Sequence, residues 1–216
     1  MIERQPTELL DDFHQFYYDS QTWQNTYWLG VPTLKCPLDM WVYQEVIFET
    51  KPDIIVECGT YMGGSALYMA SLFDLIGEGK IVTVDIESRL EHPKHRRIEY
   101  ITGSSIDDAV VEEVRRRIGE HDRVMVILDS DHSEGHVAKE LRAYAPMVSL
   151  DGYLIVEDTN INGNPVYENF GPGPKEALDA FLRDVNDFEV DRSREKFFVS
   201  FNPGGWLRRV SRSDLG

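Results

Sequence analysis

Three carboxylates follow two short apolar runs that are typical of buried strands. Asp129 follows the run RVMVIL, and Glu157 and Asp158 follow GYLIV. The carboxyl ends of neighbouring parallel strands meet at one edge of a sheet, so the three acids are expected to lie together. A hard divalent cation such as Mg²⁺ would relieve their mutual repulsion. The pattern predicts a metal site, with Asp131 as the rival first ligand; helix capping or an exposed acidic rim is the alternative.

Groups that could move a proton lie in the same stretch, LDSDHSEGH. Asp129, Asp131 or His132 could accept the proton of a substrate hydroxyl. A structural hydrogen bond is the alternative role for His132. For His136, four residues later, the structural role is the preferred interpretation.

A glycine-rich turn follows an earlier apolar run, IIVEC. Glu57 lies in this run, and Gly59, Gly63 and Gly64 follow within ECGTYMGGS. Glycine permits backbone angles and close approaches that a Cβ would prevent, so a cofactor could lie against the main chain. The turn matches neither G-x-G-x-x-G nor a phosphate-binding loop. An acid beside such a turn favours a cationic, amino-acid-bearing cofactor such as S-adenosylmethionine; a purely structural turn is the alternative.

Two further strand ends supply polar groups for this cofactor. Asp85 ends the run IVTVD and could accept hydrogen bonds from both ribose hydroxyls, and TGSS follows the next run. The small side chains of TGSS could contact adenine or ribose. The expected cofactor-binding residues are Glu57, Gly59, Tyr61, Gly63, Ser65, Asp85, Ile86, Ser104, Ser105 and Asp129.

Alternating strands and helices are needed to bring these residues together. Short apolar runs near 54–58, 80–87, 98–105, 123–132 and 152–160 alternate with amphipathic segments, which predicts an α/β fold with a mostly parallel sheet covered by helices on both faces. The tail FFVSFNPGGWLRRV predicts an antiparallel hairpin at the sheet edge. Helices are also expected near 7–18 and 38–52. We expect an N-terminal helical segment, residues 1–50, packed on a core domain, residues 51–216.

The segment after Asp158 has the composition of a mobile loop ahead of a helix. NINGNPVYENFGPGPKEALDAF follows the predicted metal ligands directly. We interpret it as a lid over the substrate site, with Tyr167, Phe170 and Lys175 as candidate contacts; an ordinary surface loop is the alternative. The aromatic residues of the first 30 positions are expected to pack on the core rather than to line the substrate site.

Charge and composition exclude several classes of protein. The chain has 216 residues, a formal net charge of −16 and two cysteines. This acidity disfavours nucleic-acid backbones and anionic membrane surfaces. No apolar run approaches the roughly 20 residues that span a bilayer, and no signal-peptide core is present. A cytoplasmic homo-oligomer acting on a small molecule is expected.

Several of these motifs together resemble a known family. VECGTYMGGSAL, VTVDIE, ITGSS, ILDSDHSEGHVAKELRAYAPMVSLDGYLIVEDTNING and GPGPKEALDAFL resemble the cephalosporin hydroxylase/rhamnosyl O-methyltransferase family, over roughly residues 28–210. The resemblance implies a Rossmann-like class I methyltransferase fold, S-adenosylmethionine as donor and a divalent metal held by the strand-end acids. Related catechol-type enzymes use Asp followed by Asp-Asn, whereas this chain carries Glu157-Asp158 at the later position.

The predicted function is therefore metal-dependent O-methylation of a hydroxyl on a small molecule or sugar, of the natural-product or glycolipid type. Mg²⁺ would lower the pKa of the hydroxyl, and positioning would supply much of the rate. A non-catalytic S-adenosylmethionine-binding partner subunit would need no metal triad. A nucleotide-dependent oxidoreductase component is the third alternative.

Overall fold

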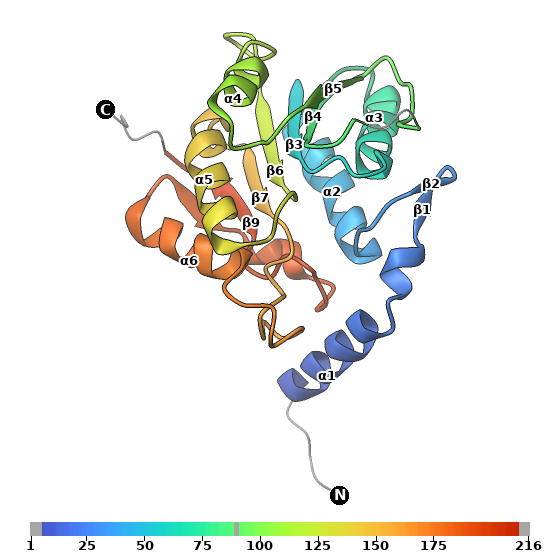
Figure 1. Cartoon of the computed structure of the whole chain (residues 1–216), viewed down its shortest axis with the longest axis vertical. Coiled ribbons are helices and arrows are strands. Elements are labelled where there is room, and N and C mark those ends of the chain that lie inside the picture. Colours follow the sequence, from blue (N-terminus) through green and yellow to red (C-terminus); the bar gives the residue numbers. More distant parts are fainter. Residues whose placement is uncertain (1–5, 89–90, 212–216) are drawn as a thin grey trace, which may run out of the picture.

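One mixed sheet organises residues 6–88 and 91–211, the part of the chain described by the computed structural model. The sheet has seven strands in the order β5-β4-β3-β6-β7-β9-β8 (Figure 1). Its first five strands in this order are parallel, as predicted. These strands are β3 (Ile54–Cys58), β4 (Lys80–Asp85), β5 (Ile98–Thr102), β6 (Val124–Leu128) and β7 (Tyr153–Val156).

The C-terminal edge of the sheet is antiparallel, but its strands differ from the predicted hairpin. β9 (Trp206–Arg209) pairs with β7 and with β8 (Phe188–Val190). The expected first arm, FFVSF, forms no strand. The backbone N–H of Phe201 instead donates to the buried Asp39 carboxylate at 2.8 Å. The Phe201 ring packs among aromatic residues of the N-terminal segment. This segment is therefore held by side chains rather than by a strand ladder.

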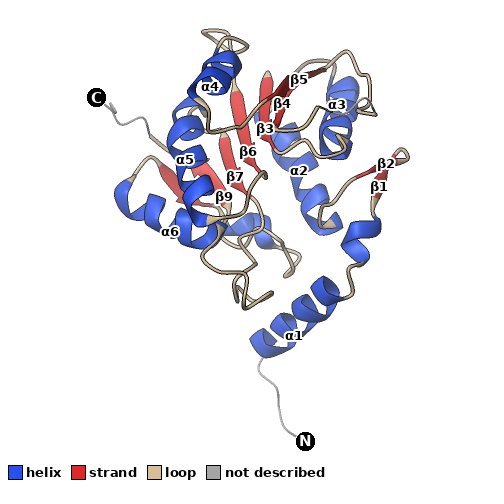
Figure 2. Ribbon diagram, in the orientation of Figure 1, coloured by secondary structure: helices blue, strands red, loops and turns tan. Residues whose placement is uncertain are grey.

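Helices cover both faces of the sheet (Figure 2). One apolar cluster joins α2 (Pro37–Thr50) and α3 (Gly64–Ile76) to one face. The other cluster joins α4 (Asp108–Arg115), α5 (Glu134–Tyr144) and α6 (Pro174–Asp184) to the opposite face. Strand residues alternate between the clusters: Val56 faces α5, whereas Ile55 faces α2 and α3. The predicted α/β class is confirmed.

The N-terminal segment runs from the edge of the molecule towards the carboxyl ends of the strands. It contains α1 (Pro6–Asp19), a 3₁₀ turn (Thr22–Asn25), and a small antiparallel pair of β1 (Tyr27–Trp28) and β2 (Val31–Pro32). α1 lies at the periphery and points away from the sheet (Figure 1). The predicted boundary at residue 50 remains a prediction. α2, which precedes it, shares an apolar cluster with α3, which follows it.

Strand order reverses between β3 and β6. Chain connections run outward to β4 on one side and to β7 on the other, so the loops after β3 and β6 separate at this point. Ligands of open parallel sheets bind at such a reversal. Among the described residues, no helix combines the length and apolar character needed to cross a bilayer.

Candidate active site

Gly59 fixes the floor of the site. It follows β3 with φ +98°, and a Cβ added to it would lie 1.9 Å from the carbonyl oxygen of Asp129. Only glycine allows the two loops at the strand reversal to lie this close. Gly64 is similarly restricted, since a Cβ there would lie 2.2 Å from the Pro32 carbonyl oxygen. The glycine-rich turn therefore brings the β3 loop against both β6 and the N-terminal segment.

Asp85 ties the glycine-rich turn to β4. Its Oδ2 accepts hydrogen bonds from the backbone N–H groups of Thr60, at 3.0 Å, and Tyr61, at 2.7 Å. Its Oδ1 accepts one from the N–H of Glu87 at 2.9 Å. Asp85 also lines a cavity beside the turn. The carboxylate thus orders the loop while it remains at the cavity wall.

Glu57 lies beneath the turn. Its carboxylate is fully buried and accepts hydrogen bonds from Ser65 Oγ, at 2.5 Å, and Thr83 Oγ1, at 2.6 Å. Burial raises the pKa of Glu57, while Lys35 and the two hydroxyls act in the opposite direction. Glu57 is therefore positioned to hold the start of α3, where Ser65 lies, and is not among the residues that line the cavities.

Two cavities meet at the strand reversal. The first, of about 530 Å³, includes Ser104, Ser105, Ser130, Asp131 and His136, and we call it the serine cavity; Ile86, 74% exposed, lies on its rim. The second, of about 300 Å³, we call the aromatic cavity; its lining includes Tyr18, Trp23, Tyr167 and Phe170. Both are lined by Gly59, Tyr61 and Asp129. The two cavities therefore adjoin at these three residues, where a molecule bound in one could contact a molecule bound in the other. Gly63, with φ +79°, lies outside both linings at the start of α3.

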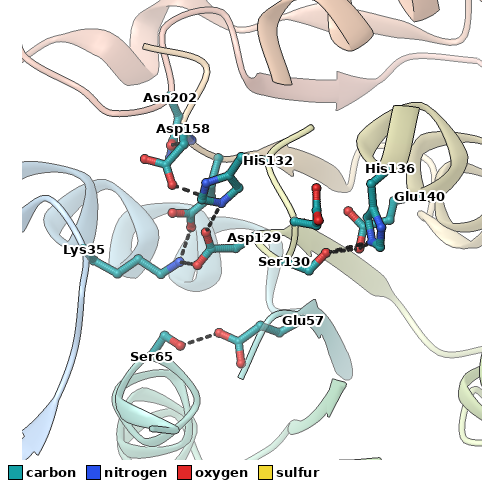
Figure 3. Close-up of polar contacts among 12 residues, drawn as sticks. Lys35, Glu57, Ser65, Asp129, Ser130, His132, His136, Glu140, Asp158 and Asn202 are labelled. Atoms are coloured by element: carbon teal, nitrogen blue, oxygen red, sulfur yellow. Dashed lines mark hydrogen bonds and ion pairs between the residues drawn. The ribbon is translucent and has the colours of Figure 1, made fainter. Parts of the chain in front are cut away.

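Asp129, His132 and Asp158 form a cluster beside this wall. One ligand atom from each residue lies within 4.8 Å of the others. His132 Nε2 is 3.4 Å from Asp129 Oδ1 and 3.2 Å from Asp158 Oδ2 (Figure 3). This nitrogen is buried without a well-formed hydrogen bond. Two carboxylates that converge on an unsatisfied imidazole nitrogen form a donor set that could hold a divalent cation.

Glu157, which the sequence placed in the metal set, has different partners in the structure. Its Oε1 accepts a hydrogen bond from Lys35 Nζ at 2.6 Å and another from the Tyr43 hydroxyl. Lys35 is 4% exposed and also lies 2.6 Å from Asp129 Oδ2. Of the predicted ligands, Asp129 and Asp158 are therefore brought together with His132, while Glu157 faces Lys35.

The charges in this cluster shift one another's ionisation. Burial opposes a charge on His132, but the carboxylates of Asp158 and Asp129 raise its pKa to about 9. Burial likewise opposes a charge on Asp129, yet Lys35 and His132 hold its pKa below the usual range. The pKa of Glu157 is raised, chiefly by burial. The cluster therefore carries Asp129 as an anion between two cations.

Asp131 has a local structural role. Its Oδ1 accepts hydrogen bonds from the backbone N–H of Ser133, at 2.8 Å, and from Ser133 Oγ, at 2.5 Å, just before α5. These bonds hold the pKa of Asp131 below its usual range. It lines the serine cavity, whereas His132 lines the aromatic cavity. The structure thus places Asp131 and His132 in different cavities, whereas Asp129, the rival of Asp131 as first metal ligand, lines both.

The aromatic cavity is walled by two distant segments of the chain. Tyr167 and Phe170 come from the predicted lid, and their ring centroids are 5.5 Å apart. Tyr18 and Trp23 come from the N-terminal segment, and the Tyr18 ring contacts Tyr167 at 6.4 Å. Lys175, the third expected contact, lies outside this lining and pairs with Asp179 on α6. Tyr18 and Trp23 pack on Phe201 of the core and also line this cavity.

Sequence reasoning missed Lys35 and the N-terminal wall. Lys35 stands alone in the loop GVPTLKCP, and its acidic partners are 94 and 122 residues away. No local pattern could identify it. The large excess of acids over bases at the strand ends is the one signal that a buried counter-charge must come from elsewhere.

A third cavity, larger than the serine and aromatic cavities, lies away from this site. It has a volume of about 700 Å³ at the amino ends of β6 and β7, and its walls include Arg123, Arg194 and Arg208. Each of these guanidiniums is already paired with a carboxylate. Its charges are therefore neutralised within the protein.

The sheet order, the glycine-rich turn after β3 and the acidic ends of β4, β6 and β7 together define a Rossmann-like, class I methyltransferase. The model of the rhamnosyl O-methyltransferase/CmcI family matches residues 20–210. The chain belongs to this family, and its predicted class of enzyme, an O-methyltransferase, is confirmed.

Curated relatives support this placement. The rhamnosyl O-methyltransferase of Mycobacterium tuberculosis (strain H37Rv) is 39% identical over 216 residues, which cover 97% of this chain and 88% of that protein. The rhamnosyl O-methyltransferase of Mycobacterium leprae is 39% identical over 215 residues, covering 97% and 94%.

Solved structures share the fold. An apo structure of CmcI superimposes with a TM-score of 0.66 and 25% identity, covering 88% of this chain and 78% of CmcI. CmcI with Mg and S-adenosylmethionine gives a TM-score of 0.64 and 23% identity, covering 87% and 78%. MycE, from mycinamycin biosynthesis, in complex with Mg, S-adenosylhomocysteine and mycinamycin VI, gives 0.56 and 23%, covering 82% and 50%.

Proposed function

We propose that this protein transfers a methyl group from S-adenosylmethionine to a hydroxyl of a sugar-bearing small molecule, with the help of a divalent cation. One observation carries the proposal: the Asp129–His132–Asp158 cluster lies where the serine and aromatic cavities share a wall. Donor and acceptor in adjoining cavities would place the methyl group between them, and such positioning supplies much of the rate of a displacement.

The serine cavity suits the adenosine part of the donor. Asp85 and the small side chains of Ser104 and Ser130 line it, and Gly59 keeps its floor free of side chains. A solved structure of CmcI is described as a complex with Mg and S-adenosylmethionine. The methionine end would then lie near Gly59 and Tyr61, where the cavities join.

The cluster residues fit a divalent cation. Asp129 and Asp158 offer carboxylate oxygens, and His132 offers the unsatisfied Nε2, which would release its proton when the cation binds. When bound there, Mg²⁺ or a similar cation would lower the pKa of a substrate hydroxyl. Asp129 and His132 line the aromatic cavity, whereas Asp131 lines the serine cavity. The pKa of His132 is raised to about 9 and that of Asp129 is held below its usual range, so we assign acceptance of the hydroxyl proton to the Asp129 carboxylate.

The aromatic cavity supports a sugar as acceptor. The rings of Tyr18, Trp23, Tyr167 and Phe170 offer apolar faces for the C–H face of a sugar ring, and the acids at the floor face its hydroxyls. The relatives of 39% identity are named for action on a rhamnosyl group. A 6-deoxyhexose such as rhamnose combines an apolar face and methyl group with vicinal hydroxyls.

Methyl transfer can be tested directly. We expect the protein to move label from methyl-labelled S-adenosylmethionine to an aryl rhamnoside, with a chelator abolishing transfer and Mg²⁺ restoring it. Binding of S-adenosylhomocysteine without stoichiometric metal binding and without transfer to any glycoside would contradict the proposal and favour a non-catalytic binding subunit.

A further inference from the structure

Glu140 is a fully buried carboxylate that the chemistry above does not use. It lies on the face of α5 turned towards the sheet, below the loops that follow β5 and β6. A buried carboxylate is costly unless several hydrogen bonds satisfy it. Its Oε2 is buried without a hydrogen-bond partner among the described residues, so the groups bonded to Oε1 indicate what Glu140 stabilises.

Two serines from different loops donate to the same oxygen of Glu140. Glu140 Oε1 accepts hydrogen bonds from Ser105 Oγ at 2.5 Å and from Ser130 Oγ at 2.6 Å. Figure 3 shows Ser130 beside Glu140 and His136. Ser105 follows β5 and Ser130 follows β6, and both line the serine cavity. One carboxylate thus joins the two loops that wall this cavity on either side.

Counting protons fixes the direction of the remaining bonds. Each serine hydroxyl has one proton, and Glu140 takes both. His136 Nε2 lies 3.0 Å from Ser105 Oγ and 3.1 Å from Ser130 Oγ. Both serine oxygens can only accept there, so His136 Nε2 carries the proton that it shares between them. Tyr144, also on α5, donates its hydroxyl proton to the Ser105 carbonyl at 2.8 Å.

This network commits the hydroxyl proton of Ser105 away from the cavity. Ser105 therefore contributes to the cavity through its position and backbone rather than as a side-chain donor. Hydrogen bonds to a charged acceptor are stronger than those between neutral groups. Loss of the charge at residue 140 would let the two loops separate and change the spacing of the cavity walls.

We propose that Glu140 is a positioning residue for the methyl donor, holding the loops after β5 and β6 at the separation that the adenosine part requires. The inference rests on the proposed function, because it assigns the serine cavity to S-adenosylmethionine. Glu140 acts through Ser105 and Ser130 and touches no reacting atom.

The test measures the affinity for S-adenosylhomocysteine by calorimetry in wild-type protein, Glu140→Gln and the matched control Glu134→Gln. Glu134 is exposed in the first turn of the same helix. Glu140→Gln keeps an acceptor but loses the charge, so we expect about tenfold weaker binding. The acceptor KM and the Mg²⁺ affinity should stay within about twofold of wild type, as should every parameter of Glu134→Gln.

A second comparison separates positioning from general destabilisation. Ser105→Ala and Ser130→Ala each remove one bond, and their effects on donor affinity should be less than additive with that of Glu140→Gln. Unchanged donor affinity in Glu140→Gln, equal loss of donor and Mg²⁺ binding, or full additivity would overturn the inference while leaving the proposed function intact. Wild-type protein that binds no S-adenosylhomocysteine would overturn the proposed function itself, and the inference with it.

Discussion

Lys35 Nζ lies 2.6 Å from Asp129 Oδ2, although 94 residues separate the two in the sequence. The same ammonium group also lies 2.6 Å from Glu157 Oε1. These carboxylates raise the pKa of Lys35 despite its burial, so it remains a cation. Lys35 is therefore a permanent counter-charge at the acidic strand ends, and its raised pKa excludes it as a proton acceptor.

Replacement of Lys35 by Met should strongly destabilise the fold. Removing one partner of a buried ion pair leaves an uncompensated charge, which costs about 3–5 kcal/mol. We expect urea unfolding at pH 8 to show a loss of this size. The double variant Lys35→Met/Glu157→Gln should recover part of it, because one stranded carboxylate becomes neutral.

Lys80→Met provides the matched control. Lys80 pairs with Glu99 in a partly exposed position, and solvent-screened pairs contribute less than about 1 kcal/mol. If Lys35→Met and Lys80→Met lower the free energy of unfolding equally, the buried ion pairs of Lys35 contribute no more to stability than the pair of Lys80.

Gly59→Ala should abolish donor binding. The new Cβ would lie 1.9 Å from the Asp129 carbonyl oxygen, at a backbone φ of +98° that alanine rarely adopts. The loops after β3 and β6 must then separate, so we expect at least about a hundredfold loss of S-adenosylhomocysteine affinity in calorimetry.

The same substitution at Gly135 is the control for Gly59→Ala, and it should stabilise the fold. Gly135 lies within α5, and a Cβ there meets no atom within 4 Å. Alanine should raise the free energy of unfolding by roughly 0.5–1 kcal/mol. If Gly59→Ala keeps wild-type affinity, Gly59 is not the floor of the donor site.

Trp23→Ala should weaken the acceptor and spare the donor. Trp23 lines the aromatic cavity and is absent from the serine cavity lining. Removing an aromatic wall should raise the acceptor KM about tenfold and leave the donor affinity within about twofold. Steady-state kinetics with each substrate varied will separate the two.

Trp41→Ala is the control for Trp23→Ala, since Trp41 is 59% exposed on α2. It should leave both KM values unchanged. An equal rise in acceptor KM for the two variants would mean that Trp23 has no direct role in the acceptor site.

His14 should make stability depend on mild acidity. Burial lowers its pKa from 6.5 to about 4, with Asp11 acting weakly in the opposite direction. As the pH falls below 6.5, His14 is therefore protonated in the unfolded chain before it is protonated in the folded protein. Stability from the neutral imidazole is fully present above pH 6.5 and falls towards pH 4, by on the order of 3 kcal/mol.

The contribution of His14 can be isolated with His14→Gln. All other groups titrate alike in the wild type and in His14→Gln. The difference between the two free energies of unfolding, measured with urea, should therefore change with pH only through His14. The wild type should lose stability relative to the variant from pH 6.5 to pH 4. Parallel curves would show that α1 is not docked through a neutral His14.

Local patterns were enough to predict the parallel sheet and the edge at which its acidic strand ends lie. The runs IIVEC and RVMVIL become β3 and β6 because short apolar segments between helices need burial on both faces. Gly59 could be identified because a side chain at a strand reversal blocks close approach. These features depend on neighbours in the sequence.

Features that depend on distant partners could not be predicted. Lys35 and Trp23 reach the site from the N-terminal segment, and nothing near them in the sequence marks that position. Glu157 and Asp158 are adjacent but face different partners, Tyr43 and His132, because successive side chains diverge after the strand end. The apolar run FFVSF failed as a strand because Asp39 and the N-terminal aromatics hold it.

The central claim is that the Asp129–His132–Asp158 cluster holds the divalent cation used in methyl transfer. Titration of Mn²⁺, monitored by electron paramagnetic resonance in the presence of S-adenosylhomocysteine, tests it with Asp158→Asn and Asp131→Asn. The account predicts one bound Mn²⁺ in the wild type and in Asp131→Asn, with affinity at least about tenfold lower in Asp158→Asn. Loss of the ion in Asp131→Asn with full retention in Asp158→Asn would contradict it.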